Sequence, residues 1–326
     1  MHFLSLLSAG IALATLGSAK DTRYLFTFGD SYSRTGFDIK GDKPTTKNPL
    51  GNPAMPGKTS SGGKNWIGYV LEEKNKDHDT LSWNFASGGA TVDKSIIVGS
   101  KSNVQSFTEQ VKSFQDTVGK KPDYAKWDGD SAAVGVWMGL NDLGTSYYRK
   151  NSTKVIEKSV DKYFEELESL YKTGIRKFFL LQVPRKYQHQ GVVPLESHKR
   201  LTWRPLATYR TPLIQKKGRS KARKLQKATK AYNKRLNDKL NKFKKSHKDV
   251  KAALVKTEAS FKKALDTPKS VGAKNNKCTN KDGKSCALAD DGFLLQLWRD
   301  TYHPGTGIHK LVAAKVTKAL KDIKFW

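Results

Sequence analysis

The sequence predicts an α/β fold in which a parallel sheet carries helices on both faces. Two observations favour this fold. Several short segments are apolar almost throughout, which is typical of strands buried on both faces, whereas a half-exposed strand alternates polar and apolar residues. Segments with apolar residues spaced by three and four lie between them, as expected of helices that connect parallel strands. With no internal repeat and no linker, residues 20–326 are expected to form a single domain.

Five segments are predicted to be strands, because each is apolar and ends at or close to a turn-forming residue such as Gly, Asn, Asp or Pro. In chain order they are residues 24–28, 81–86, 132–138, 178–183 and 252–255. Ligands of open parallel sheets bind beyond the carboxyl ends of the strands. The residues that follow each segment are therefore the first candidates for a functional site.

Helical periodicity is clearest in two later segments. The first has its apolar residues between Val155 and Tyr171. The second lies in a strongly basic stretch, residues 216–251, which holds sixteen Lys or Arg against two Asp. Its apolar residues fall on one helical face, and they are Leu225, Tyr232, Leu236, Leu240 and Phe243. This pattern predicts an amphipathic helix over residues 219–246 with a solvated cationic face, rather than a disordered tail.

Residues 184–218 follow the fourth predicted strand and show no clear period. They contain Pro194, Pro205 and Pro212. A loop of this length inside a compact domain is often a lid or a substrate wall, and it would emerge at the ligand edge of the sheet. A surface excursion without such a role fits the sequence equally well.

The first 19 residues are interpreted as a secretory signal peptide. The apolar run from Phe3 to Leu16 is short, and the small residues Gly17, Ser18 and Ala19 follow it. The run is too short to span a bilayer, and no later segment approaches the roughly 18 apolar residues of a membrane helix. We therefore expect a secreted, extracellular protein, and we expect it to be a monomer.

Two further features fit an extracellular protein. Cys278 and Cys286 flank a polar loop with no histidine nearby, which favours a local disulfide over a zinc site. Closing so short a loop would contribute roughly 2–3 kcal/mol. Asn151 begins the sequence Asn-Ser-Thr, which is typical of an N-glycosylated surface loop.

Polar residues suited to ester hydrolysis follow the predicted strands. Ser31 comes directly after the first strand, in FGDSYS. Gly88 and Gly89 follow the second, in NFASGGAT, where backbone amides can approach a ligand closely. Asn141 follows the third, in GLND, and offers a side-chain amide. A serine esterase needs such a hydroxyl, and it needs such donors for the developing oxyanion.

A base and its orienting group are found near the C-terminus. Asp300 precedes His303 by three residues in DTYHPGTGIH, and Pro304 opens a predicted helix. Within a single turn the carboxylate can reach Nδ1 of the imidazole and leave Nε2 for a serine. Three other histidines lack such a context and are interpreted as ordinary polar residues: His189, His198 and His309.

Together these motifs resemble the SGNH, or GDSL-type, hydrolase family. FGDSYS, NFASGGAT, GLND and DTYH occur in the family's order from Phe28 to His303, so the resemblance covers nearly the whole predicted domain. Within the family, SSGGKNWIGYV (residues 60–70) and DTYHPGTGIH are similar to fungal-type secreted acetyl esterases active on carbohydrates. The resemblance implies a flavodoxin-like three-layer α/β/α sandwich, which agrees with the periodicity. It implies no metal or organic cofactor.

The resemblance also implies roles for residues of this chain. Ser31 would be the nucleophile and would give its backbone amide to the oxyanion hole. Gly89 would give a second backbone amide, with its neighbour Gly88 as the alternative, and Asn141 a side-chain donor. The site also needs a general base for the serine hydroxyl.

His303 would act as general base and then as general acid, oriented by Asp300. The expected function is that of a secreted serine esterase that hydrolyses acetyl esters on plant cell-wall oligosaccharides through an acyl-enzyme.

The net charge of +30 is the feature that this function does not require. Such a surface favours anionic partners, and an acidic polymer or a membrane surface could bind the basic helix over residues 219–246. Two other functions therefore stay open. One is a lipase or phospholipase that acts on anionic lipid surfaces, and the other is a catalytically inert cationic binding protein on the same scaffold. No motif for specific nucleic-acid recognition is found.

Overall fold

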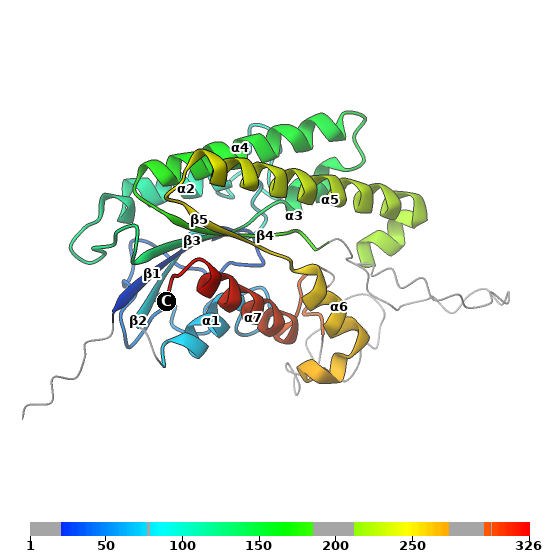
Figure 1. Ribbon diagram of the computed structural model, residues 1–326. Coiled ribbons are helices and arrows are strands. Elements are labelled where there is room, and N and C mark those ends of the chain that lie inside the picture. Colours follow the sequence, from blue (N-terminus) through cyan, green and yellow to red (C-terminus); the bar gives the residue numbers. More distant parts are fainter. Residues whose placement is uncertain (1–20, 77–78, 185–211, 274–296, 301) are drawn as a thin grey trace, which may run out of the picture.

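The computed structural model describes residues 21–76, 79–184, 212–273, 297–300 and 302–326, and it contains all five predicted strands in one parallel sheet (Figure 1). The strands are β1 (Thr22–Gly29), β2 (Asp79–Asn84), β3 (Ala132–Trp137), β4 (Lys177–Leu181) and β5 (Lys251–Val255). Their order in the sheet is β2-β1-β3-β4-β5, and every neighbouring pair is parallel. The predicted fold class is therefore confirmed.

The inner strands are apolar throughout because both of their faces are covered. In β4, Phe178 packs on one side of the sheet and Phe179 on the other, and both are fully buried. Opposite Phe179 in β3 lies Gly135, where an added Cβ would stand 2.2 Å from the Phe179 ring. A side chain at that position would displace the ring, so only glycine lets the two strands pair at this register.

Helices form a layer on each face of the sheet, as Figure 1 shows. On one face lie α1 (Trp66–Lys74), α6 (Glu258–Asp266) and α7 (Thr306–Asp322), together with the 3₁₀ turn η2 (Pro268–Val271). On the other face lie α2 (Phe107–Asp116), the 3₁₀ turn η1 (Val118–Lys120), α3 (Leu140–Ser146), α4 (Ser152–Lys172) and α5 (Pro212–Ser246). The result is the expected α/β/α sandwich.

The basic stretch forms α5, which is longer than the predicted helix and lies beside α4 (Figure 1). Its apolar side chains enter the core, and Tyr232 and Leu236 are fully buried. Asn233 anchors the helix to the end of β4, because its side chain accepts from the Val183 N–H at 3.0 Å and donates to the Val183 carbonyl at 2.7 Å. The cationic face of α5 is thus held in a fixed place by its apolar face.

Some sequence predictions lie outside the described residues. These are the signal peptide over residues 1–19, the disulfide between Cys278 and Cys286, and most of the loop over residues 184–218. Near the C-terminus, Pro304 pairs with Trp298 in a short bridge, and α7 begins two residues later than predicted. No helix in the described part of the chain is both long and apolar enough to cross a membrane.

Candidate active site

Ser31 lies in a turn that begins where β1 ends at the carboxyl edge of the sheet. The turn is fixed by Asp30, whose fully buried carboxylate accepts from the Tyr32 N–H at 2.9 Å. The Asp30 carbonyl accepts from the amides of Ser33 and Arg34 at 3.1 and 3.0 Å. The Ser31 side chain is partly exposed, and its hydroxyl makes no hydrogen bond within the described residues. It is therefore accessible to a substrate.

The loop after β2 runs alongside this turn, since the Ser87 N–H donates to the Gly29 carbonyl at 3.0 Å. A Cβ added to Gly88 would lie 4.0 Å from the Cβ of Ser31. Gly89 has a φ of +84°, and a Cβ there would lie 1.9 Å from the Ser100 hydroxyl, so the turn requires glycine. Among the hydrogen bonds of the described residues, neither glycine N–H is a donor, which leaves both available to a ligand.

Asn141 lies in the first turn of α3, directly beyond β3. Its Nδ2 donates to the Ala90 carbonyl at 2.8 Å and lies 3.5 Å from the Asp30 Oδ2. The shorter contact fixes the amide against the loop after β2. The longer one is at the limit of a hydrogen bond, so the second N–H is only weakly engaged. The Asn141 amide thus lies between the turn that holds Ser31 and the loop that holds Gly88.

Asp300 and His303 form the hydrogen-bonded pair that the sequence predicts. The His303 Nδ1 lies 2.7 Å from the Asp300 Oδ2. The other oxygen, Oδ1, accepts from the backbone amides of Tyr302 and His303 at 2.7 and 2.8 Å. With the proton on Nδ1, the Nε2 atom is left as a base. Burial opposes the charge on Asp300, but the hydrogen bonds from His303 and the two amides outweigh it and lower the pKa of the carboxyl.

Tyr32 connects this pair to the nucleophile turn. Its hydroxyl donates to the Tyr302 carbonyl at 2.6 Å, and its ring centroid lies 6.0 Å from that of His303. The base therefore packs against the residue that follows Ser31. No hydrogen bond between Ser31 and His303 is formed within the described structure, which is common for catalytic groups without substrate. Four segments distant in sequence thus converge beyond the ends of β1, β2 and β3.

Two buried carboxyl groups lie behind the site. Asp142, the neighbour of Asn141, accepts from the Val92 N–H at 3.1 Å and from the Ser159 hydroxyl at 2.6 Å. Burial raises the pKa of Asp142 to about 6 in spite of these donors. Burial also raises the pKa of Asp30 to about 7, although the Tyr32 amide opposes it, and the charge on Asp142 adds to the rise. Both carboxyl groups are buried and hold the surrounding loops in place.

The interpretation of His309 as an ordinary polar residue is wrong. His309 is only 1% exposed, and its ring packs against Tyr32 and Trp137 at 6.2 and 6.4 Å between centroids. Burial, reinforced by nearby His303, lowers the pKa of His309 to about 3, so the ring is neutral. Its position three residues before Val312 and seven before Val316, both buried, is the periodicity that would have placed it inside. His189 and His198 lie outside the described residues.

Comparisons with known proteins agree with the motifs. The sequence model of the family described as GDSL-like lipase/acylhydrolase matches residues 25–316. The acetylesterase of Thermothelomyces thermophilus is 40% identical over 305 residues, which cover 93% of this chain and 90% of that protein. Among solved structures, the acetylxylan esterase Axe2 of Geobacillus stearothermophilus is 14% identical with a TM-score of 0.47, covering 94% of this chain and 98% of its own. A GDSL-like lipase from Parabacteroides merdae ATCC 43184 is 12% identical with a TM-score of 0.47, covering 93% and 97% of the two chains.

Proposed function

The chain belongs to the family of GDSL-like lipases and acylhydrolases, and we propose that it uses Ser31 to remove acetyl groups from plant cell-wall oligosaccharides. It is a carboxylic ester hydrolase by its family and by its 40% identity to an acetylesterase. The observation that carries the assignment of the site is the convergence of Ser31, Asn141 and the Asp300–His303 pair at one edge of the sheet.

In the first half of the reaction, the Ser31 Oγ attacks the ester carbonyl carbon while the His303 Nε2 takes the hydroxyl proton. Asp300 holds the imidazole in the required tautomer and stabilises the imidazolium that forms. Two backbone amides and the His303 ring hold Asp300 in turn, which prevents the carboxylate from rotating away. The alcohol then leaves with the proton from His303, and the acyl group stays on Ser31.

The negative charge of the tetrahedral intermediate needs preorganised donors. The N–H of Ser31, the N–H of Gly89 or its neighbour Gly88, and the Asn141 side chain are proposed to supply them. Asn141 suits this role because one of its two N–H groups is fixed by Ala90 and the other is held only loosely. Water activated by His303 attacks the acyl-enzyme in the second half of the reaction and releases the acid.

The preference for acetyl groups is supported by the curated relative, which is an acetylesterase. The alternative of a lipase gains little support from the described surface, because enzymes that act at lipid interfaces expose contiguous apolar area. Apart from residues 212–222, whose side chains are not described, only four large hydrophobic side chains of the described residues are strongly exposed: Val98, Tyr124, Tyr148 and Tyr302.

The test is a comparison of acyl groups. We expect turnover of nitrophenyl acetate and acetylated xylo-oligosaccharides, a steep fall for butyrate and none for octanoate or for anionic phospholipid vesicles. Ser31→Ala serves as the control for activity from contaminating esterases. A preference for octanoate, or a rise in rate on vesicles, would replace the acetyl esterase with the lipase. Binding to anionic polymers without turnover of any ester would support the inert binding protein.

We further propose that the chain is secreted as one domain after removal of residues 1–19, with Cys278 and Cys286 disulfide-bonded and a glycan on Asn151. Asn151 supports this because it is exposed and its side chain makes no capping hydrogen bond at the start of α4. Intact mass and N-terminal sequencing of the protein from culture medium check all three features. An N-terminus at Met1, a mass that corresponds to two free thiols, or an unmodified Asn151 would contradict them separately.

A further inference from the structure

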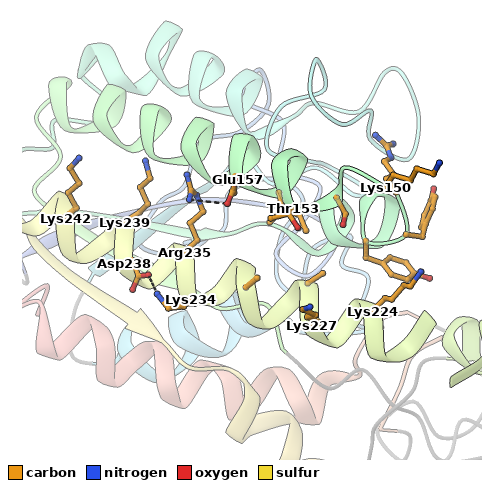
Figure 2. A pocket seen from close by; sticks show the side chains of 17 residues that line it. Lys150, Thr153, Glu157, Lys224, Lys227, Lys234, Arg235, Asp238, Lys239 and Lys242 are labelled. Carbon is orange, nitrogen blue, oxygen red and sulfur yellow. Dashed lines mark hydrogen bonds and ion pairs between the residues drawn. The ribbon is translucent and has the colours of Figure 1, made fainter. Parts of the chain in front are cut away.

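A groove of about 760 Å³ lies between α5 and the segment that runs from the end of α3 into α4, on the opposite helix layer from α7 (Figure 2). Its walls are strongly basic. Five cations that line it form no ion pair with any described residue, and they are Arg149, Lys150, Lys224, Lys227 and Lys242. All five are exposed. Their charges are therefore available to an external anion.

The acidic side chains of the groove are already occupied. Asp238 pairs with Lys234 at 2.5 Å, and Glu157 lies 3.9 Å from Arg235, as the dashed lines in Figure 2 mark. Just beyond the groove, Asp161 contacts Arg235 at 2.8 Å and Lys239 at 2.7 Å. The pairs made by Glu157 and Asp161 hold α5 against α4, whereas Asp238 and Lys234 both lie in α5. The remaining positive charge of the groove is not neutralised by the described residues.

One end of the groove is connected to the catalytic edge of the sheet by α3. Asn141 lies in the first turn of α3 and Tyr147 directly follows its last turn, so a single short helix, roughly 9 Å long, connects the proposed oxyanion donor to the groove. Figure 2 shows Lys224, Lys227, Arg235, Lys239 and Lys242 in succession along α5. From Lys224 to Lys242 the helix extends for about 27 Å. An elongated basic groove of this kind suits a linear anionic chain.

We propose that this groove binds an acidic polysaccharide, a chain bearing uronic-acid carboxylates, and so holds the polymer that carries the acetyl esters. The choice of a sugar polymer rests on the proposed function, because α3 connects the groove to the edge where that function places the ester. Tyr148 stands at this end with 54% of its surface exposed and can contact a sugar ring. The net charge of +30, of which α5 carries the largest block, then serves to retain the enzyme on its substrate.

A membrane surface fits the groove less well. A helix that lies on a bilayer must turn its apolar face into the lipid. From Leu225 onward the apolar residues of α5 instead pack against the sheet and α4, and Tyr232, Leu236 and Leu240 are at most 3% exposed. The cations are also gathered at a hollow between two helices and not on a convex face. Of the two partners that the sequence left open for the basic helix, these observations favour the acidic polymer over the membrane surface.

The experiment measures binding to polygalacturonate by titration calorimetry, in Ser31→Ala protein that also carries Asn151→Gln. The first change prevents turnover, and the second makes the protein uniform at residue 151; the Ser31→Ala protein with Asn151 intact is measured alongside it and is expected to bind as well. Because no ester is cleaved, the result does not depend on whether acetyl esters are the substrate. We expect binding that weakens strongly between about 0.05 M and about 0.5 M NaCl and no binding of a neutral xylo-oligosaccharide.

Charge reversal then locates the site. In this background, Lys224→Glu, Lys227→Glu and Lys242→Glu together should weaken binding by about tenfold or more. The matched control reverses Lys263, Lys315 and Lys321, three exposed lysines on α6 and α7 that form no ion pair with described residues. It changes the net charge equally and should keep the affinity within about twofold. Thermal unfolding of both variants verifies that each is folded.

Three results would overturn the proposal. Equal loss in the two triple variants would show that net charge alone, and not the groove, attracts the polymer. Tighter binding to anionic vesicles or to single-stranded RNA than to polygalacturonate, lost only in the groove variant, would assign the groove to that other partner. Absence of polygalacturonate binding at low salt would remove the site.

Discussion

The catalytic edge and the basic groove are adjacent, yet they hold their polar groups in opposite ways. At the edge the groups that orient the base have fixed partners, as Asp300 does with two backbone amides and the His303 ring. In the groove the five free cations project from one face of α5 and the turn before α4 without acidic partners. Chemistry depends on where single atoms lie, whereas attraction of a polymer depends on how many charges face it. One substitution should therefore abolish catalysis, whereas several are needed to weaken the binding of a polymer.

The largest expected effect is that of Ser31→Ala. Loss of the nucleophile should lower kcat for nitrophenyl acetate by about 10⁴- to 10⁶-fold, since a serine triad without its serine retains only the contribution of binding and the oxyanion hole. The midpoint of thermal unfolding should stay unchanged, because the Ser31 hydroxyl makes no hydrogen bond in the described residues. If the variant turned over nitrophenyl acetate at the wild-type rate, catalysis at this edge would not depend on Ser31.

Asp300→Asn should have the next largest effect. Asparagine keeps the shape but can leave the proton on the wrong nitrogen of His303, and a fall in kcat of roughly 10³- to 10⁴-fold is expected. The measurement is kcat of the wild type and of the variant, each at low and at high pH on a single preparation. A fall in kcat of less than tenfold would mean that the two backbone amides orient this turn and that the carboxylate does not.

Asn141→Ala should cost about 10²- to 10³-fold in kcat with a smaller change in KM, as expected for a donor that acts in the transition state. The variant also frees the Ala90 carbonyl, so its free energy of unfolding must be measured alongside. If KM rises and kcat stays constant, Asn141 binds the substrate and not the oxyanion.

The smallest expected effect concerns Asp30, which holds the nucleophile turn from behind. Its pKa in the folded protein is about 7, above the value near 4 of an exposed carboxyl, so the folded state binds more protons than the unfolded state between these pH values. The stability it contributes is present below pH 4 and is lost as the pH rises through 7.

Asp30→Asn should remove this pH-dependent contribution to stability, because the side-chain amide stays neutral and its oxygen can still accept from the Tyr32 N–H. Relative to the wild type, the free energy of unfolding of the variant should rise by up to about 1.4 kcal/mol per pH unit between pH 4 and pH 7. Urea unfolding across that range provides the measurement. The charge on Asp142 is one cause of the raised pKa of Asp30, so the difference between the two proteins reports on the pair and not on Asp30 alone. Parallel curves for the two proteins would mean that Asp30 is ionised throughout.

The strands and the long helices could be predicted because their causes are local. Segments such as residues 132–138 are apolar on both faces and admit few other structures, and the apolar face of α5 repeats at helical spacing in the middle of many lysines. The order of the motifs at the strand ends also followed from the sequence. Asn141 was correctly expected beyond β3.

Other features depend on contacts between distant segments. The bond from Asn141 to Ala90 joins the loop after β2 to the start of α3, across 51 residues. The groove exists only because α5 lies beside α4 while Ala228 and Ala231 leave space between them. His309 is buried because α7 packs behind Tyr32, so its neutral ring could not be inferred from residue type alone.

The position of α3 has a kinetic consequence. Because this one helix joins Asn141 to the mouth of the groove, a polymer retained by the lysines would keep its esters within reach of Ser31 while individual sugars exchange. Attachment of this kind makes each later encounter intramolecular, at an effective concentration on the order of millimolar, whatever the bulk concentration of ester. Several acetyl groups could then be removed from one chain before it diffuses away, and the number removed per encounter should fall as salt is added.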